Sequence, residues 1–259
     1  MKPYYESAGI TIYHGDCRDV LPSLEAVDCV MTSPPYNQLG SRIPENPTGL
    51  WAKADGGAQW VSDLASNGYA DDMPEDEYQS SQREIFATIR TTSDASLFYN
   101  HQLRWRDGRL LHPVQWFVPD GWLLRQEIIW NRGGGMMMNA RMFCRFDERV
   151  LWFDRGSHKW NQSAVGYGTV WNINKAQNKE HPVAYPEELA ARCISAVTDE
   201  TSIVLDPFMG SGTTLKAAKN LNRRAIGIEM QERWCELAAE RLSQEVLDFS
   251  EGRSAQPHD

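Results

Sequence analysis

Residues 203–214 read Ile-Val-Leu-Asp-Pro-Phe-Met-Gly-Ser-Gly-Thr-Thr, and this stretch indicates the fold of the chain. The run Ile203–Leu205 is apolar and β-branched, which is typical of a buried strand. Gly210 and Gly212 permit positive φ and let a ligand approach the backbone closely, and Thr213 can begin a helix. A Gly-rich turn between a strand and a helix is a feature of doubly wound nucleotide-binding sheets. Gly-x-Gly alone is common, and a plain turn with Gly for compactness is the alternative interpretation.

A second motif, Thr32-Ser33-Pro34-Pro35-Tyr36, follows the apolar run 27–31 near the start of the chain. Its two prolines hold the turn in one shape. The Ser33 hydroxyl and the Pro34 carbonyl can both accept hydrogen bonds from an amino group, and the Tyr36 ring offers a surface on which a planar base can stack. The motif therefore suits a planar amine as substrate. The alternative is a strand-to-loop turn with a packed tyrosine.

Alternating strands and helices predict a doubly wound, largely parallel α/β sheet. Seven runs have the composition of strands: 10–14, 27–32, 96–100, 126–131, 149–153, 203–206 and 225–229. Helical stretches lie between several of them, with apolar residues at three–four spacing: 76–92, 186–198, 213–221 and 232–247.

The length of 259 residues favours one domain spanning 1–259, because a second full domain would be cramped. Two insertions interrupt the alternation of strands and helices. Residues 37–74 are rich in Gly, Asn, Asp and Pro, and we interpret them as a long loop or lid. Residues 132–180 form a second insertion around the expected strand 149–153.

Charge is unevenly distributed along the chain, whose net charge is −9. Residues 131–180 hold eight Lys or Arg against four Asp or Glu, whereas residues 38–82 hold two against eight. Phosphate contacts need positive charge, so the first segment is the expected place for a nucleic acid and the second is not. An acidic protein can still bind DNA when its positive charge is focused at a cleft.

The five cysteines are odd in number and include no Cys-x-x-Cys pair. This pattern predicts reduced thiols in a cytoplasm, with neither a disulfide framework nor a zinc site. No apolar run approaches the length of a membrane span, and residues 1–10 do not read as a signal peptide.

In their order along the chain, these motifs resemble the S-adenosylmethionine-dependent DNA methyltransferases that modify exocyclic amino groups, in the permuted arrangement of the β class. In that family a Ser, Asp or Asn followed by Pro-Pro and then Tyr or Phe precedes a Phe-x-Gly-x-Gly motif. Three further segments match in the family's order: Gly15-Asp16-Cys17, then His181-Pro182 with Pro186-Glu187-Glu188-Leu189, and Glu229. The resemblance covers most of the chain and implies a Rossmann-like, seven-stranded sheet with a circularly permuted motif order.

The resemblance also implies S-adenosylmethionine as cofactor and double-stranded DNA as partner, with roles assigned by position. The catalytic residues would be Ser33, Pro34, Pro35 and Tyr36. The cofactor-binding residues would be Asp16, Cys17, His181, Pro182, Asp206, Pro207, Phe208, Gly210, Ser211, Gly212, Thr213, Glu229 and Met230. Residues 132–180 would be a small target-recognition region, with DNA contacts from Arg132, Arg141, Arg145 and Lys159 and further candidates in Lys175, Trp160 and Asn161.

Some of these residues have simpler alternatives. Glu229 could instead cap a helix, and Asp16 could be an ordinary turn aspartate. A lone histidine before a proline, as at His181, is more often structural. Any single arginine of the basic segment could equally belong to a solvated surface loop.

The sequence thus predicts a site-specific DNA methyltransferase that acts on the amino group of a flipped base. Ser33 before Pro-Pro and the Tyr185-Pro186 continuation favour cytosine N4, with adenine N6 as the alternative. A non-catalytic protein that binds the cofactor or DNA, and a methyltransferase for RNA or protein glutamine, are competing hypotheses. The absence of a Pro-Cys dipeptide removes the nucleophile that cytosine-C5 methyltransferases need. We expect a cytoplasmic, prokaryotic or phage-encoded protein, with a homodimer and a cognate restriction endonuclease as further partners to test.

Overall fold

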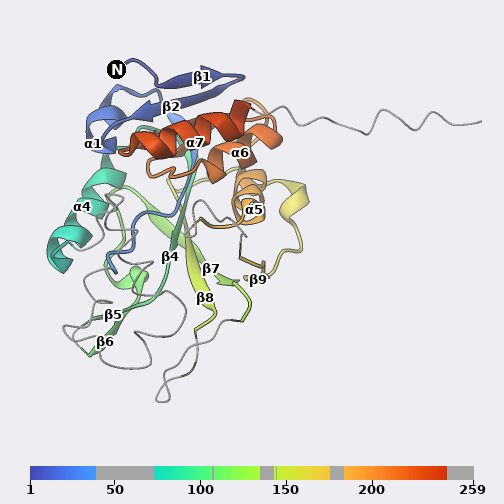
Figure 1. The fold of residues 1–259 in the computed structure, drawn as a ribbon. Helices are drawn as coiled ribbons and strands as arrows, with labels where there is room; N and C mark the ends of the chain where they lie inside the picture. Colours follow the sequence, from blue (N-terminus) through green and yellow to red (C-terminus); the bar gives the residue numbers. More distant parts are fainter. Residues whose placement is uncertain (39–72, 107, 135–142, 144, 176–183, 244–259) are drawn as a thin grey trace, which may run out of the picture.

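The computed structural model describes residues 1–38, 73–106, 108–134, 143, 145–175 and 184–243. Its centre is a nine-stranded sheet in the order β1-β2-β11-β10-β3-β4-β8-β7-β9 (Figure 1). The strands are β1 (Tyr5–Ser7), β2 (Ile10–His14), β3 (Val27–Thr32), β4 (Thr91–His101), β7 (Leu123–Asn131), β8 (Asp147–Asp154), β9 (Val170–Asn172), β10 (Ile203–Asp206) and β11 (Arg224–Glu229). β2, β11, β10, β3 and β4 run parallel, whereas β8 lies antiparallel between β4 and β7. The strands β5 (Arg104–Arg106) and β6 (Arg109–Leu111) form a separate ribbon.

All seven predicted strands are present, so the prediction of a doubly wound, mostly parallel α/β sheet is confirmed. The predicted count of seven strands is wrong, because β1 and β9 add one strand at each edge. Both are three residues long, which is too short to show an alternating pattern in the sequence. β4 begins at Thr91, inside the stretch predicted as helix.

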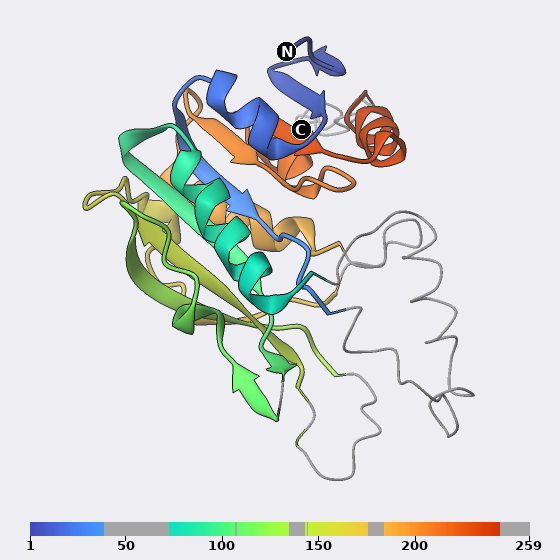
Figure 2. The same cartoon turned by 90° about the vertical axis from the view of Figure 1, so that its left-hand side faces the viewer.

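Helices cover both faces of the sheet. α5 (Glu187–Val197), α6 (Thr213–Asn220) and α7 (Glu232–Ser243) pack on one face. α1 (Cys17–Val20) and α4 (Glu75–Thr88) pack on the other, which is turned toward the viewer in Figure 2. Met31 and Phe98 belong to the first core and Val30 and Leu97 to the second, because successive residues of a strand point to opposite faces. The four predicted helices are thus present within the described residues.

Glycines set how closely the Gly-rich turn packs on its neighbours. A Cβ on Gly227 of β11 would lie 2.4 Å from Met209 Sδ and 2.8 Å from a Leu215 methyl carbon. A Cβ on Gly212, where φ is +78°, would lie 3.0 Å from Ala238 Cβ of α7. The turn and α6 can therefore approach β11 and α7 only because these two side chains are absent.

The carboxyl ends of the parallel strands share one edge of the sheet, referred to below as the carboxyl edge. His14, Glu229, Asp206, Thr32 and His101 are the last residues of β2, β11, β10, β3 and β4. Ligands of doubly wound sheets bind outside this edge. Because β8 is antiparallel, it begins at this edge and ends at the opposite one.

Three further features concern membrane helices, metal-binding groups and cysteines. No described helix is both long and apolar enough to cross a membrane. In the same part of the chain, His, Cys, Asp and Glu side chains form no group suited to holding a metal ion. The described cysteines are free and buried, at positions 17, 29, 193 and 235.

Candidate active site

The two motifs meet at the carboxyl edge, on the neighbouring strands β3 and β10. Thr32, directly before Ser-Pro-Pro-Tyr, donates a hydrogen bond of 2.7 Å from Oγ1 to Asp206 Oδ1. Thr214 Oγ1 and Tyr185 OH donate to Asp206 Oδ2 at 2.5 and 3.2 Å. Asp206 is 1% exposed, and burial raises the pKa of its carboxyl group. Asp206 therefore joins the two motifs from within the core, with its side chain already used by protein donors.

Glu229 contacts the Gly-rich turn directly. Its Oε2 accepts a hydrogen bond from Gly210 N at 3.1 Å, and its Oε1 accepts one from Gln231 N at 2.9 Å. Burial raises the pKa of the Glu229 carboxyl group. The bond to Gln231 is a capping contact just before α7, but a carboxylate can accept about four hydrogen bonds. Acceptor capacity thus remains for the hydroxyl groups of a ligand.

The Gly15-Asp16-Cys17 turn lies beside Glu229, since Gly15 N donates to the Glu229 carbonyl at 2.9 Å. Asp16 caps α1 by accepting from Arg18 N at 2.9 Å, and hydrogen bonding from the Arg18 side chain lowers the pKa of Asp16. Cys17 is 4% exposed, and burial raises the pKa of its thiol to about 12. Only the backbone of Cys17 can therefore meet a ligand, because its side chain packs in the core.

Within the Gly-rich turn, Phe208 and Gly210 are partly exposed, whereas Pro207, Ser211 and Thr213 are buried. Arg241 of α7 donates to Ser211 Oγ at 3.1 Å, so Ser211 has a structural partner. Gly210 has a φ of +50°, in the region that favours glycine. The accessible part of the turn is thus the Phe208 ring and the backbone of Gly210.

Of the remaining predicted cofactor residues, the structure describes Met230 but not His181 and Pro182. Met230 is 65% exposed, and its carbonyl lies 3.1 Å from His14 Nε2, so it sits at the rim of the site. His181, Pro182 and the insertion residues 39–72 lie outside the described residues.

Ser33 and Tyr36 belong to a partly buried hydrogen-bond network with Asn100 and Glu148. Ser33 Oγ and Tyr36 OH lie 2.7 Å apart, and Tyr36 OH donates to Glu148 Oε2 at 2.9 Å. Asn100 Nδ2 donates to Tyr36 OH at 2.6 Å and to Glu148 Oε2 at 2.9 Å. Arg132 donates to the other oxygen, Glu148 Oε1, at 2.6 Å. The network holds a carboxylate, 5% exposed, within one hydrogen bond of the Tyr36 hydroxyl.

Tyr78 and His101 hold the motif from a second direction. Tyr78 OH donates to the Pro35 carbonyl at 2.7 Å and lies 2.9 Å from His101 Nε2. The rings of His101 and Tyr36 are 4.6 Å apart. Burial lowers the pKa of His101 to about 3, so its ring is neutral near pH 7. No described residue donates to the Pro34 carbonyl, whose lone pairs can therefore receive an amino group.

Sequence reasoning misses Asn100 and Glu148. Asn100 closes the predicted strand 96–100, and its place near the carboxyl end of a strand is a usable signal. Glu148 lies just before the predicted strand 149–153, where a doubly wound pattern suggests the amino edge. Because β8 is antiparallel, that position instead lies at the carboxyl edge.

Two of the predicted DNA contacts lie near this network. Arg132 forms an ion pair with Glu148. Arg145 donates to the Leu103 carbonyl at 2.6 Å, and burial lowers the pKa of its guanidinium. Arg141 lies outside the described residues. Both placed arginines thus have structural partners at the carboxyl edge.

Lys159, Trp160 and Asn161 lie apart from the other predicted DNA contacts that the structure describes. Lys159 follows the end of β8 at the opposite edge of the sheet, where its Nζ lies 3.1 Å from Asp199 Oδ2. The adjacent Trp160 stacks on Trp152 with ring centroids 5.4 Å apart, and Asn161 donates to main-chain carbonyls around the end of α5. The antiparallel direction of β8 places these residues away from the catalytic motif, at the opposite edge of the sheet.

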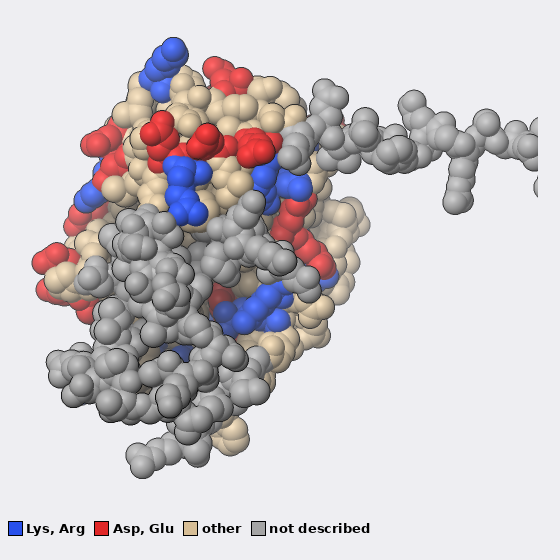
Figure 3. Space-filling model, in the orientation of Figure 1, with Lys and Arg blue, Asp and Glu red and all other residues tan. Residues whose placement is uncertain are grey.

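The distribution of charge agrees with a nucleic acid at the carboxyl edge. Exposed glutamates recur along α7 at positions 232, 236 and 240, and Figure 3 shows acidic side chains over that helix. Lower on the same face, Lys and Arg side chains border the residues drawn in grey. A polyanion is repelled by the first surface and attracted by the second.

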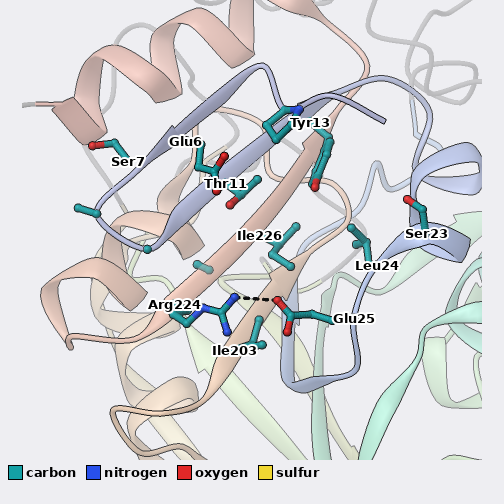
Figure 4. A pocket seen from close by; sticks show the side chains of 14 residues that line it. Glu6, Ser7, Thr11, Tyr13, Ser23, Leu24, Glu25, Ile203, Arg224 and Ile226 are labelled. Atoms are coloured by element: carbon teal, nitrogen blue, oxygen red, sulfur yellow. Dashed lines mark hydrogen bonds and ion pairs between the residues drawn. The ribbon is translucent and has the colours of Figure 1, made fainter.

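A cavity of about 440 Å³ lies at the opposite edge, where β10 and β11 begin (Figure 4). Ile203, Leu24 and the ion pair between Arg224 and Glu25, 2.7 Å long, belong to its lining. No residue of either motif lines this cavity, and it is not the candidate active site.

Comparison with known proteins bears on the class of enzyme. The family model described as DNA methylase, for N6 and N4 methyltransferases, matches residues 27–240. The type II methyltransferase M.XycI of Xanthomonas campestris pv. cyanopsidis is 29% identical over 271 residues, which cover 90% of this chain and 88% of that protein. The structure of the cytosine-N4-specific PvuII DNA methyltransferase is similar with a TM-score of 0.68 at 19% identity, covering 96% of this chain and 92% of that one. The M1.HpyAVI–SAM complex has a TM-score of 0.62 at 22% identity, covering 90% and 99%.

The fold and the family match define an S-adenosylmethionine-dependent methyltransferase with a Rossmann-like sheet. The chain belongs to the N6/N4 DNA methylase family, whose model spans well over half of its length. It is therefore a DNA methyltransferase that uses S-adenosylmethionine and acts on DNA.

We expect Glu229→Gln to weaken S-adenosylmethionine binding by about 1–3 kcal/mol, because an amide cannot accept on both of its terminal atoms. The raised pKa of Glu229 adds a pH dependence: wild-type affinity should fall on acidification, beginning at a higher pH than for an ordinary glutamate. Calorimetry over a pH series measures both effects. Glu236→Gln, on the exposed face of α7, is the control; equal affinities for the two variants would leave Glu229 with its capping role alone.

Proposed function

We propose that this enzyme transfers the methyl group of S-adenosylmethionine to the exocyclic amino group of a flipped base, with cytosine N4 as the favoured target. The observation that carries the proposal is the 2.7 Å hydrogen bond between Thr32 and Asp206. It joins the residue before Ser-Pro-Pro-Tyr to the first residue of the Gly-rich turn. The two reacting groups would then be held at adjacent strand ends, as transfer between them requires.

The residues of the turn fit the cofactor. Glu229, whose carboxylate can accept further hydrogen bonds, suits the ribose hydroxyls. The amino end of α6, which has no side-chain cap at Gly212, lies directly behind the turn, and its positive dipole end would favour the carboxylate of the methionine moiety. Phe208 and the backbone of Gly15–Cys17 would border the remaining parts of S-adenosylmethionine. When bound, S-adenosylmethionine supplies an electrophilic methyl group on a sulfonium sulfur.

The network around Ser33 determines which way its hydroxyl points. Tyr36 OH has one proton, which it donates to Glu148 Oε2. The 2.7 Å contact between Ser33 and Tyr36 then requires Ser33 to be the donor. Ser33 Oγ thus presents lone pairs, together with the Pro34 carbonyl, to the amino group of the base. Two acceptors would draw that nitrogen toward tetrahedral geometry and aim its lone pair at the methyl group.

The same chain of hydroxyls offers a route for the proton that the amino group must lose. Ser33 Oγ can accept this proton while its own proton moves to Tyr36 OH. Tyr36 can in turn pass its proton to Glu148 Oε2, 2.9 Å away. Each oxygen then ends with one proton, and Glu148 holds the proton that the base has lost.

Glu148→Gln should therefore lower kcat roughly 10- to 100-fold, because the final proton acceptor is lost. Cofactor affinity should change little, since Glu148 lies on β8 and not at the Gly-rich turn. Steady-state kinetics with saturating DNA and calorimetry for the cofactor measure the two quantities. Glu84→Gln on the exposed side of α4 is the control, and an unchanged kcat for Glu148→Gln would remove Glu148 from the proton route.

The preference for cytosine rests on Ser33, since Asp at that position would favour adenine. It is tested by incubating the purified protein with unmethylated DNA and a donor labelled in its methyl group. After digestion to nucleosides, we expect the label in N4-methylcytosine. Label in N6-methyladenine would reassign the target base, and unlabelled DNA would contradict the proposed function itself.

A further inference from the structure

The β5–β6 ribbon has one face on the protein and one face in solvent. Arg104 pairs with Leu111, Trp105 with Leu110, and Arg106 with Arg109 across the ribbon. Directly paired residues share a face, and successive residues alternate between faces. Arg104 is 2% exposed and so marks the inner face, whereas Trp105 and Leu110 are 48% and 44% exposed on the outer one.

The inner face fixes the ribbon beside the catalytic motif. Arg104 makes two hydrogen bonds of 2.6 Å to the carboxylate of Glu75, at the start of α4. Arg106 donates to the carbonyl of Asn37, the residue after Tyr36. The ribbon thus follows the end of β4 by three residues and touches the catalytic segment one residue beyond its tyrosine. Figure 2 shows the ribbon extending beyond the end of the sheet.

The outer face has no occupant within the described part of the chain. A large aromatic side chain and a leucine are exposed side by side on a ribbon of two three-residue strands, which gains little stability by itself. Arg109 pairs with Arg106 and so does not share the outer face with Trp105 and Leu110, but it is exposed at the end of the ribbon, next to Gly108. No described residue forms an ion pair with Arg109. An apolar pair on a ribbon that ends in an exposed arginine suits a partner that is both polyanionic and aromatic.

We propose that the β5–β6 ribbon contacts duplex DNA beside the flipped base, with Trp105 on its outer face against the neighbouring base pairs and Arg109 at its exposed end on a phosphate. The inference rests on the proposed function, because it places the DNA at Ser33–Tyr36. A two-stranded ribbon fits the major groove, and an aromatic side chain can stack on a base that has become accessible. The acidic surface of α7 excludes the alternative approach from that side.

The main test compares two tryptophans of equal exposure. Trp105→Ala should raise the DNA Kd roughly 10-fold, in line with the loss of one aromatic–base contact, and Trp105→Phe should restore most of it. Trp160→Ala is the matched control, because Trp160 is also 48% exposed but lies away from the carboxyl edge. Cofactor affinity and the thermal midpoint of each variant report whether the fold is intact. Equal DNA affinities for both alanine variants would overturn the inference.

A second variant separates charge from stacking. Arg109→Gln should reduce the slope of log Kd against log salt by about 0.9, the value for one phosphate contact, whereas Arg233→Gln on α7 should leave it unchanged. If Trp105→Ala alters the oligomeric state and not DNA binding, the outer face is a contact between copies of the chain and the inference is wrong. Methyl transfer by the wild type is measured in parallel. If the wild type transfers no methyl group, the proposed function is wrong. If the wild type is active but Trp105→Ala binds DNA as tightly, only the inference about the ribbon is wrong.

Discussion

Tyr36→Ala lowers kcat by about 100- to 1000-fold while leaving S-adenosylmethionine affinity nearly unchanged, the effect of removing a group that acts on the transition state. The substitution removes the ring that faces His101 and the hydroxyl that links Ser33 to Glu148. The flipped base then loses its stacking surface, and Ser33 loses the partner that orients its hydroxyl. Single-turnover kinetics with cofactor binding measured separately distinguish this result from a loss of cofactor.

Tyr36→Phe divides the two roles of the side chain. It keeps the ring, and Asn100 Nδ2 remains 3.3 Å from Ser33 Oγ. We expect a loss in kcat of roughly 10-fold, the low end for a group in a proton route. If cofactor affinity collapses in the alanine variant while turnover per bound cofactor does not, Tyr36 belongs to the cofactor site and its assigned role is wrong.

Gly210→Val weakens S-adenosylmethionine binding on the order of 100-fold, because a β-branched residue is strained at this backbone conformation and projects into the turn. Gly210 has a φ of +50°, and its N–H group donates to Glu229. A valine would disturb both the turn and the carboxylate that receives the ribose. Calorimetry gives the affinity, and the thermal midpoint gives the accompanying loss of stability.

Gly166→Val is the control for backbone strain. Gly166 has a φ of +101° and no atom within 4 Å of an added Cβ, and it lies beyond β8 in the chain. It should lower stability with no change in cofactor affinity. Equal weakening of cofactor binding by the two variants would show that general strain, and not the Gly-rich turn, controls the affinity.

Most of the helices and strands follow from short-range patterns in the sequence. The run Ile203–Leu205 followed by a Gly-rich turn and the spacing of Leu215 and Ala218 in α6 are short-range features, and each determines the element in which it lies. The sequence does not predict β9, because this strand forms through pairing between Trp130 and Trp171, which are distant in the sequence. A three-residue strand has no periodicity of its own to detect.

The site was predictable where one segment carries the chemistry. Ser33–Tyr36 and the Gly-rich turn each act through neighbouring residues, so their motifs reveal them. Glu148 reaches Tyr36 only because β8 is antiparallel, and Lys159 is removed from the site for the same reason. Strand direction depends on long-range pairing that composition does not encode. The composition of residues 131–180 therefore predicts a single basic surface, although β8 places parts of this segment at both edges of the sheet.

We propose that Ser33–Tyr36, supported by Glu148, position a base amino group of DNA for methylation. The most direct measurement is to express the wild type and Tyr36→Ala in a host free of DNA methylation and to map modified bases across its genome. We predict N4-methylcytosine in one sequence context for the wild type and a near absence of modification for the variant. Unmodified DNA in the wild-type cells, or equal modification by the variant, would contradict the account.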